Sequence, residues 1–297
     1  MNLFMQGMRR SGTTIVFDIL SQDSRFDLHY EPLSAGRVGA LGGGSKVQKL
    51  DLMEKTLQSR EEFLRENPHI VADMTAFNYG APRNPSLELE SILPSVCLEY
   101  LRHLLHSKHN VIKFTRMYRK ARVLADLDPK AYVVLLVRDP RNVVASYLYG
   151  RGQRRMHKYA TRELFFTRNS KMNSWKCRQF ADAIAEQENR PECRNVSNWL
   201  RPLIVWEYTF RHFYREAQEL YGERFRLLRH EDLCADPTAE TIRLYQHIGL
   251  EPDHQVVQWA AQNVRGNFTE CYSDDPRWSD AFERYGMMST LQTAGYA

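Results

Sequence analysis

The segment 2–21 constrains this chain more than any other, because it joins an apolar run, a glycine-framed loop and a helix. Residues 2–6 are mostly apolar and end at Gly7, which predicts a buried strand that enters a tight turn. Residues 13–21 carry apolar side chains at helical spacing. Between them, Gly7 and Gly12 frame a loop whose backbone N–H groups can surround an anion at the amino end of the helix. The segment predicts a phosphate site, and the plain alternative is a structural strand-to-helix turn.

Strand and helix patterns alternate along the rest of the chain. Such alternation is typical of an α/β fold in which a central parallel sheet is flanked by helices. No repeat or low-complexity linker divides the sequence, so we expect one domain over residues 1–297. The glycine-rich stretch 26–50 is expected to be irregular. The expected later strands are 70–74, 110–114, 131–137 and 224–229, and the expected helices are 52–66, 87–107 (broken near Pro94), 118–126, 142–149, 175–187, 196–221, 237–248 and 253–264.

Composition narrows the classes of function. The chain has 297 residues, of which 43% are apolar, so disordered and fibrous classes are excluded. A net charge of +5 indicates an anionic ligand rather than a nucleic-acid coat. The five cysteines form no Cys-x-x-Cys pair, and neither a signal peptide nor a bilayer-length apolar run is visible. We therefore expect free thiols, a cytoplasmic location and no membrane span.

The side chains of the first loop strengthen its anion-binding character. Arg10 supplies a fixed positive charge, and Thr13 and Thr14 supply hydroxyl donors. The glycine spacing matches the Gly-x4-Gly frame of a nucleotide-binding P-loop, but Thr13 occupies the position of the P-loop lysine. That departure argues against a site that hydrolyses ATP or GTP.

Two segments together resemble sulfotransferases that use 3′-phosphoadenosine 5′-phosphosulfate (PAPS). Residues 10–14, Arg-Ser-Gly-Thr-Thr, are similar to the family's 5′-phosphosulfate loop, and residues 134–146 to its 3′-phosphate motif. The resemblance implies a P-loop-like sulfotransferase fold. It also implies that Arg138 and Ser146 hold the 3′-phosphate; the plain alternative is a simple ion pair between Arg138 and Asp139. The loop residues that it assigns to PAPS are Arg9, Arg10, Ser11, Gly12, Thr13 and Thr14.

Two weaker similarities lie later in the chain. Residues 227–233 resemble the family's late strand and turn, in which an aromatic residue contacts adenine. His230 holds that position here, so stacking on adenine is expected from an imidazole ring. Residues 291–296 resemble the family's terminal helix. The family also has a last phosphate contact near the C-terminus, which we assign to Arg265, with Arg277 as the alternative.

Sulfuryl transfer depends mainly on positioning and on neutralising charge. Arg10 is the natural group to stabilise the departing phosphate. The chain lacks the Lys-Thr-His segment that supplies the base in cytosolic aryl and steroid sulfotransferases. Glu31 instead resembles the glutamate of the tyrosylprotein and carbohydrate branch, so we predict Glu31 as general base and Lys113 as the residue that orients the sulfuryl oxygens. His29 is the alternative base, and Glu31 could also serve only to anchor the loop by pairing with Arg10.

Positive charge is concentrated in residues 113–158, which hold 12 Lys+Arg and three Asp+Glu. Part of this excess, Arg151, Arg154, Arg155 and Lys158, follows the 3′-phosphate motif and is expected either to cover the cofactor, to bind an anionic acceptor or to form a solvated basic face. The histidines at 103, 106 and 109 lack acidic or thiolate partners nearby, so no metal site is expected.

The sequence as a whole predicts a metal-independent, PAPS-dependent O-sulfotransferase of bacterial type. Its acceptor is a hydroxyl of a glycan, a lipid or another metabolite, anionic ones included, and no nucleic-acid partner is expected. A P-loop small-molecule kinase is one alternative, although it needs a loop lysine and a Mg²⁺-binding acidic strand end. A module that binds a nucleotide or an anionic polymer without turnover is the other. The sequence leaves the oligomeric state open.

Overall fold

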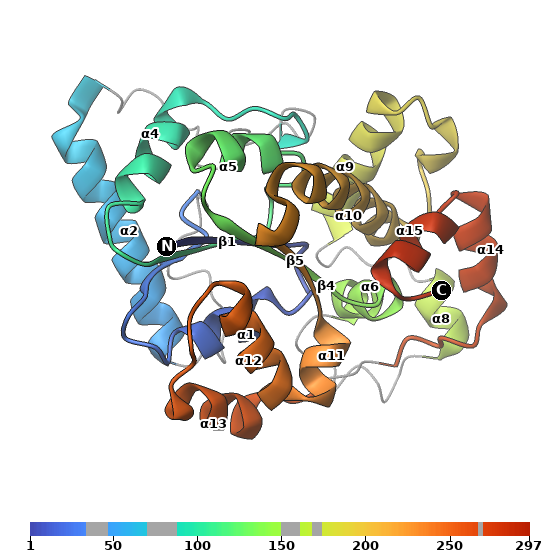
Figure 1. Cartoon of the computed structure of the whole chain (residues 1–297). Helices are drawn as coiled ribbons and strands as arrows, with labels where there is room; N and C mark the ends of the chain where they lie inside the picture. Colours follow the sequence, from blue (N-terminus) through green and yellow to red (C-terminus); the bar gives the residue numbers. More distant parts are fainter. Residues whose placement is uncertain (34–46, 70–87, 150–160, 168–173, 267–269) are drawn as a thin grey trace.

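A five-stranded parallel sheet forms the centre of the computed structural model (Figure 1). The structure describes residues 1–33, 47–69, 88–149, 161–167, 174–266 and 270–297. The strands are β1 (Asn2–Gly7), β2 (Asp27–Tyr30), β3 (Asn110–Phe114), β4 (Tyr132–Val137) and β5 (Phe225–Arg229). Their order across the sheet is β2-β3-β1-β4-β5, and each neighbouring pair is parallel. The expected α/β class with a central parallel sheet is therefore confirmed.

Alternate residues of the central strands enter two separate apolar cores. In β1, Phe4 faces one core while Leu3 and Met5 face the other, and all three are fully buried. In β4, Val133 and Val134 divide in the same way. A strand covered on both faces needs apolar side chains in both registers, which explains the near-continuous apolar runs of these segments.

Helices cover both faces of the sheet (Figure 1). On the first face, α4 (Ser95–Leu104), α5 (Ala121–Leu127) and the long α10 (Leu200–Tyr221) supply the larger core. On the opposite face, α1 (Thr13–Leu20), α12 (Pro237–His247) and α13 (His254–Asn263) supply the smaller one. The remaining elements are α2 (Val47–Glu66), α6 (Pro140–Tyr149), α8 (Arg162–Thr167), α9 (Ser174–Gln187), the short 3₁₀ turns Pro191–Cys193 and Gly222–Arg224, α11 (His230–Ala235), α14 (Pro276–Arg284) and α15 (Met288–Ala294).

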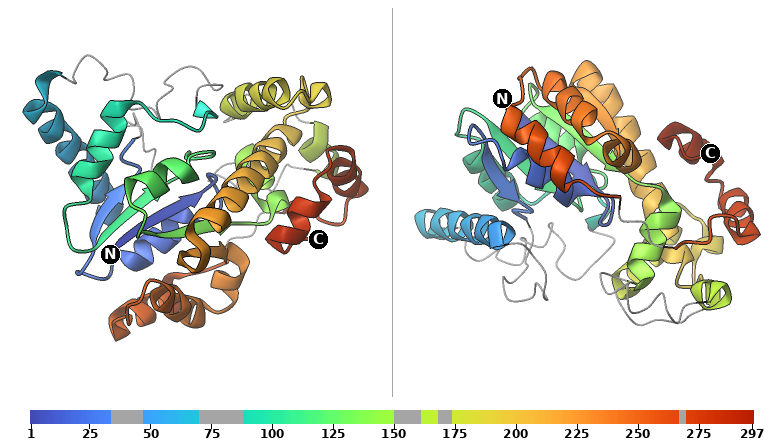
Figure 2. Two further views of the ribbon diagram at one scale, coloured as in Figure 1. Left: turned by 45° about the horizontal axis from the view of Figure 1, so that its top comes forward. Right: turned by 90° about the horizontal axis from the view of Figure 1, so that it is seen from below.

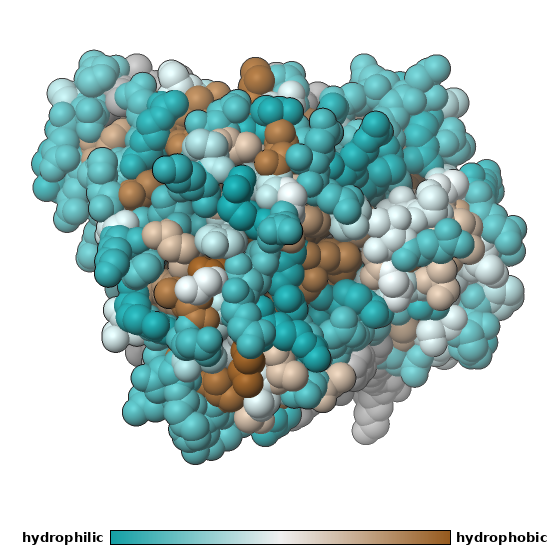
Figure 3. Space-filling model, in the orientation of Figure 1, coloured by the Kyte–Doolittle hydropathy of each residue, from teal (hydrophilic) through white to brown (hydrophobic). Residues whose placement is uncertain are grey.

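The C-terminal helices lie far from the N-terminus, beside α6 and α10 (Figure 2). An aromatic cluster joins them to α8, since Phe166 lies edge-on to Trp278 with ring centroids 5.6 Å apart. The face seen in Figure 3 is mainly hydrophilic, with apolar side chains in scattered patches.

Strand β2 corrects the expectation that residues 26–50 are irregular. It is only four residues long, lies at the edge of the sheet, and alternates polar Asp27 and His29 with Leu28 and Tyr30. So short an edge strand has a weak sequence pattern, and its pairing with β3 is what fixes it.

Several helix boundaries also differ from the expectations. The helix expected over 87–107 is broken near Pro94 as expected, and its later part, α4, begins directly after this proline because proline cannot continue a preceding helix; α4 ends at Leu104, before residue 107. Helices α8, α11 and α14 were not expected; they are six to nine residues long, too short for a clear periodic pattern. The strand expected at 70–74 lies outside the described residues, and the single-domain assignment remains a prediction.

Candidate active site

The carboxyl ends of the parallel strands gather the predicted site residues along one edge of the sheet. The loop after β1 leads into α1, Glu31 directly follows β2, Arg138 directly follows β4, and His230 directly follows β5. Strand β1 lies at the point where the strand order reverses: β2 and β3 are added on one side of it, and β4 and β5 on the other. Open parallel sheets bind ligands at such a point, beyond the carboxyl ends of the strands.

The loop after β1 has the backbone of an anion cradle. Gly12 has a φ of 90° and Arg10 a φ of 78°, and the Ser11 N–H donates to the Met8 carbonyl at 3.1 Å. No side chain caps α1, and no acidic residue occupies its first turn. The amino end of α1 is therefore directed at the loop with no carboxylate competing for its N–H groups.

Both glycines of the loop are required by close packing. A Cβ at Gly7 would lie 2.7 Å from Thr13 Cγ2 and 2.8 Å from the Leu136 carbonyl oxygen. A Cβ at Gly12 would overlap Cδ2 of His230. The β5–α11 turn is thus in direct contact with the loop, and His230 lies against it.

Two buried side chains accompany the loop on this side of the sheet. Arg138 is 7% exposed, and its Nη1 donates to the Arg10 carbonyl oxygen at 3.4 Å. Burial lowers the pKa of Arg138, with Glu231 acting in the opposite direction. Ser146 is buried on α6. Arg138 is therefore placed beside the loop, with Ser146 on the helix that follows.

His230 is held neutral by its surroundings. Burial, with a further contribution from the charge of Arg138, lowers its pKa to about 4. Its Nδ1 lies 3.4 Å from the Cys234 thiol sulfur. A neutral imidazole does not repel the neighbouring guanidinium.

A second group of side chains lies across β2 and β3. Lys113 Nζ donates to Glu31 Oε1 at 2.5 Å and lies 3.9 Å from the centre of the Tyr30 ring. Lys113 is 1% exposed; burial lowers its pKa, but the charges of Glu31 and Tyr30 and their hydrogen bonds outweigh that effect and raise it. The Tyr30 hydroxyl lies 3.4 Å from Thr14 Oγ1. Tyr30 therefore links the predicted base and lysine to the phosphate loop.

A model of the sulfotransferase family matches residues 2–197, about two thirds of the chain. This chain belongs to the sulfotransferase family. The match covers the loop, Glu31, Lys113, Arg138 and Ser146, and it confirms the family resemblance that the two phosphate motifs indicated. Membership of the tyrosylprotein and carbohydrate branch remains a prediction.

Two solved sulfotransferase structures from bacteria align with this chain. Sulfotransferase STF9 from Mycobacterium avium aligns with a TM-score of 0.52 at 15% identity, over 98% of this chain and 76% of that one. A sulfotransferase from Alicyclobacillus acidocaldarius aligns with a TM-score of 0.48 at 13% identity, over 100% of this chain and 96% of that one. The first likeness shows a shared fold. No curated protein sequence matches this one.

The two candidate bases, His29 and Glu31, lie in different surroundings. His29 is 6% exposed, and its Nε2 lies 3.6 Å from Asp27 Oδ2 on the same strand. Burial lowers the pKa of His29, while Asp27 raises it. Asn110, at the start of β3, and Leu104, at the end of α4, also act to raise the pKa of His29. Glu31, at the carboxyl edge beside Lys113, is therefore the better placed of the two.

The two arginines proposed for the last phosphate contact have other partners in the described residues. Arg265 is exposed and donates to the Ala261 and Val264 carbonyls at the end of α13. Arg277 pairs with Asp275 and with Glu163. The assignment of the last phosphate contact to Arg265, with Arg277 as the alternative, stays a prediction. The basic residues Arg151, Arg154, Arg155 and Lys158 lie outside the described residues.

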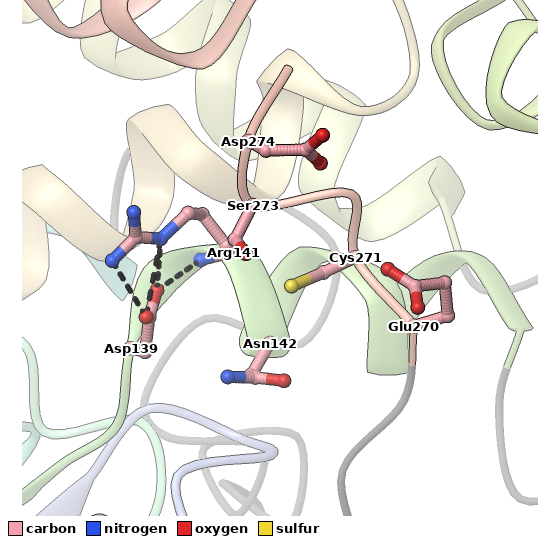
Figure 4. A pocket seen from close by; sticks show the side chains of 7 residues that line it. All are labelled: Asp139, Arg141, Asn142, Glu270, Cys271, Ser273 and Asp274. Atoms are coloured by element: carbon pink, nitrogen blue, oxygen red, sulfur yellow. Dashed lines mark hydrogen bonds and ion pairs between the residues drawn. The ribbon is translucent and has the colours of Figure 1, made fainter.

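An open pocket of about 540 Å³ lies beside the 3′-phosphate motif (Figure 4). Asp139 and Arg141 lie on one side of it and pair at 2.8 Å, and the 270–274 segment lies on the other.

Among the described residues, no group of three or more His, Cys, Asp or Glu side chains is arranged to hold a metal ion. None of the described helices is long and apolar enough to cross a membrane.

Four residues of the site were missed by the sequence analysis. Tyr30 contacts both Lys113 and Thr14. Trp206 and Glu231 hydrogen-bond the peptide group between Arg138 and Asp139, and Tyr296 hydrogen-bonds Glu231. Glu231 and Tyr296 lie within segments that resemble the family, but neither spacing nor composition indicated that they meet. Trp206 lies in the middle of α10 and reads in the sequence as an ordinary core residue.

Proposed function

We propose that this sulfotransferase transfers the sulfuryl group of PAPS to an acceptor hydroxyl. The observation that carries the proposal is that two groups of side chains lie on one sheet edge. Arg138 lies against the glycine loop, and this group would bind the anion; Glu31 pairs with Lys113, and this pair would supply the base. Tyr30 connects them through Thr14. A transferase needs such an arrangement, because donor and acceptor must meet in line.

The loop fits the proposed donor. Gly7 and Gly12 leave no room for side chains, so the backbone can approach a phosphosulfate closely. Arg9 is exposed and Arg10 is half-buried at the loop, while Ser11 and Thr13 are buried within it. Arg138 and Ser146 would hold the 3′-phosphate, and His230 would stack on adenine. When bound, PAPS supplies the sulfuryl group and leaves as adenosine 3′,5′-bisphosphate.

Three side chains of the protein would carry out the transfer. Glu31 takes the proton from the acceptor hydroxyl as the new S–O bond forms. Lys113, held charged by Glu31, neutralises the sulfuryl oxygens. Arg10 and the N–H groups of the loop stabilise the negative charge that develops on the 5′-phosphate as its bridging S–O bond breaks. No step requires a metal ion.

The proposal extends to the class of acceptor and to a cytoplasmic location of the protein. By analogy with the branch that Glu31 resembles, a glutamate base favours the hydroxyl of a glycan or a peptide over that of a phenol or a steroid. The hydroxyl of a lipid or of another metabolite is the other acceptor class that we propose. Cys97, Cys193, Cys234 and Cys271 are free thiols, as the reducing cytoplasm of a bacterium would keep them.

Thermal shift with three ligands tests the donor. Adenosine 3′,5′-bisphosphate should raise the melting temperature more than ATP with Mg²⁺ or heparin, because only a ligand of the folded state stabilises it. Stabilisation by ATP with Mg²⁺ alone would indicate a kinase. Transfer of radiolabelled sulfate from PAPS to a panel of acceptors tests turnover; binding of the bisphosphate with no transfer to any acceptor class would indicate a binding module.

A further inference from the structure

One peptide group of the 3′-phosphate motif is hydrogen-bonded on both sides. The Trp206 indole N–H donates to the Arg138 carbonyl oxygen at 3.1 Å, and the Asp139 N–H donates to Glu231 Oε1 at 3.0 Å. This carbonyl and this N–H belong to the same planar peptide group. Its orientation is therefore fixed, and with it the direction in which the Arg138 side chain leaves the end of β4.

Glu231 is itself held by the C-terminal segment. The Tyr296 hydroxyl donates to Glu231 Oε2 at 2.6 Å. The Tyr296 ring lies 4.6 Å below the Arg229 guanidinium and is 9% exposed. Burial, with the charge of Glu231, raises the pKa of Tyr296, so the hydroxyl remains a donor. We call this pair the Glu231–Tyr296 latch.

Asp139, whose N–H belongs to this peptide group, also begins helix α6. The Arg141 N–H donates to Asp139 Oδ1 at 2.8 Å, and the Val143 N–H donates to the Asp139 carbonyl at 3.0 Å. Asp139 thus acts as the amino-terminal cap of the helix that carries Ser146. Both groups assigned to the 3′-phosphate therefore depend on the peptide that the latch holds.

We propose that the Glu231–Tyr296 latch is a positioning device that orients Arg138 and Ser146 for a nucleotide carrying a 3′-phosphate. The inference rests on the proposed function. The latch lies next to the 3′-phosphate motif, on the far side of β1 from Lys113 and Glu31. It serves ligand selection and takes no part in proton transfer.

Ligand preference in the absence of turnover tests the latch. Calorimetry on the full-length protein would compare adenosine 3′,5′-bisphosphate with adenosine 5′-monophosphate, which lacks the 3′-phosphate. Tyr296→Phe removes one hydroxyl and keeps the ring. We expect it to lower affinity for the bisphosphate about 3- to 10-fold, the loss that corresponds to one hydrogen bond, and to leave affinity for the monophosphate unchanged.

Glu231→Ala separates positioning from simple electrostatics. Removing this carboxylate takes a negative charge away from Arg138, so an electrostatic role alone would strengthen phosphate binding. Loss of the Asp139 N–H acceptor should instead weaken binding of the bisphosphate, about 10-fold or more. Tighter binding by Glu231→Ala would overturn the proposal.

Tyr245→Phe is the matched control. Tyr245 is also buried and also donates to a carboxylate, Asp23 Oδ2 at 2.9 Å, but it lies on α12 against the smaller core. The Tyr245→Phe variant should be less stable, but the ratio of its affinities for the bisphosphate and the monophosphate should be unchanged. If Tyr296→Phe left that ratio unchanged, or lowered both affinities equally, the latch would be only structural. If the unmodified protein showed no preference for the bisphosphate, the proposed function itself would be wrong.

Discussion

The two sides of the sheet edge are built by different means. On the β4 and β5 side, the proposed phosphate site uses backbone geometry: a left-handed Gly12, the amino end of α1, and a peptide group bonded on both sides. On the β2 and β3 side, the proposed base depends on one ion pair, Lys113 with Glu31. A nucleotide phosphate has a fixed shape that backbone groups can match, whereas proton transfer needs a titrating side chain. We therefore expect changes on one side to alter binding and changes on the other to alter turnover.

Glu31→Gln should have the largest effect. Glutamine keeps an oxygen that can accept the bond from Lys113 but cannot take up a proton. We expect kcat to fall about 10²- to 10⁴-fold, with affinity for the bisphosphate nearly unchanged. Steady-state kinetics and calorimetry would measure both, and Asp27→Asn, at the other end of β2, is the control. Unchanged turnover would mean that Glu31 only anchors the loop.

Gly12→Ala tests the closest packing on the phosphate side. Alanine at a φ of 90° is strained, and its Cβ would overlap His230. We expect a loss of about 2–4 kcal/mol in the free energy of unfolding, measured in urea. Combining it with His230→Ala should recover part of that loss, because the clash is removed while the backbone strain remains. Full additivity of the two changes would show that the residues do not touch.

Arg138→Ala should weaken binding more than catalysis. Loss of a charged partner for the 3′-phosphate corresponds to a decrease of about 10- to 100-fold in affinity for the bisphosphate. Under saturating donor, kcat should change far less. Arg226→Ala, which removes an arginine paired with Glu240 elsewhere on β5, is the matched control. An equal loss of kcat at saturation would place Arg138 in the chemical step.

His230 should make stability depend on pH. Its pKa is about 4 when folded, so between pH 6.5 and 4 the unfolded chain binds a proton that the folded protein does not. Stability should therefore fall as pH drops through this window, by about 1–2 kcal/mol between pH 7 and pH 5 from this residue. Urea unfolding of the unmodified protein and of His230→Asn measures the difference in slope. Identical slopes would show that His230 titrates normally.

The smallest expected effect concerns the last phosphate contact. Arg265→Ala should lower affinity for the bisphosphate about 2- to 5-fold, as loss of one exposed charge near a phosphate would. Arg277 already pairs with Asp275 and Glu163, so Arg277→Ala should leave affinity unchanged. The reverse result would transfer the contact to Arg277.

The phosphate loop and β4 could be predicted because their signals are local. Glycine spacing, a following helix and an apolar run are all contained in neighbouring residues. Strand β2 could not be predicted, because it is a short edge strand whose structure depends on pairing with β3. Lys113 and Glu31 were named as site residues through resemblance. Their contact arises because the register of β2 and β3 places Tyr30 opposite Lys113, so that the Glu31 N–H donates to the Lys113 carbonyl at 2.9 Å.

The sequence by itself determined the α/β class, the family and the order of the two phosphate motifs, because each depends on patterns within a few residues. Only the tertiary structure decided which distant groups meet. Glu31 and Lys113 are 82 positions apart, and Tyr296 reaches Glu231 across 65. Such contacts depend on strand register and helix packing, which no local pattern encodes.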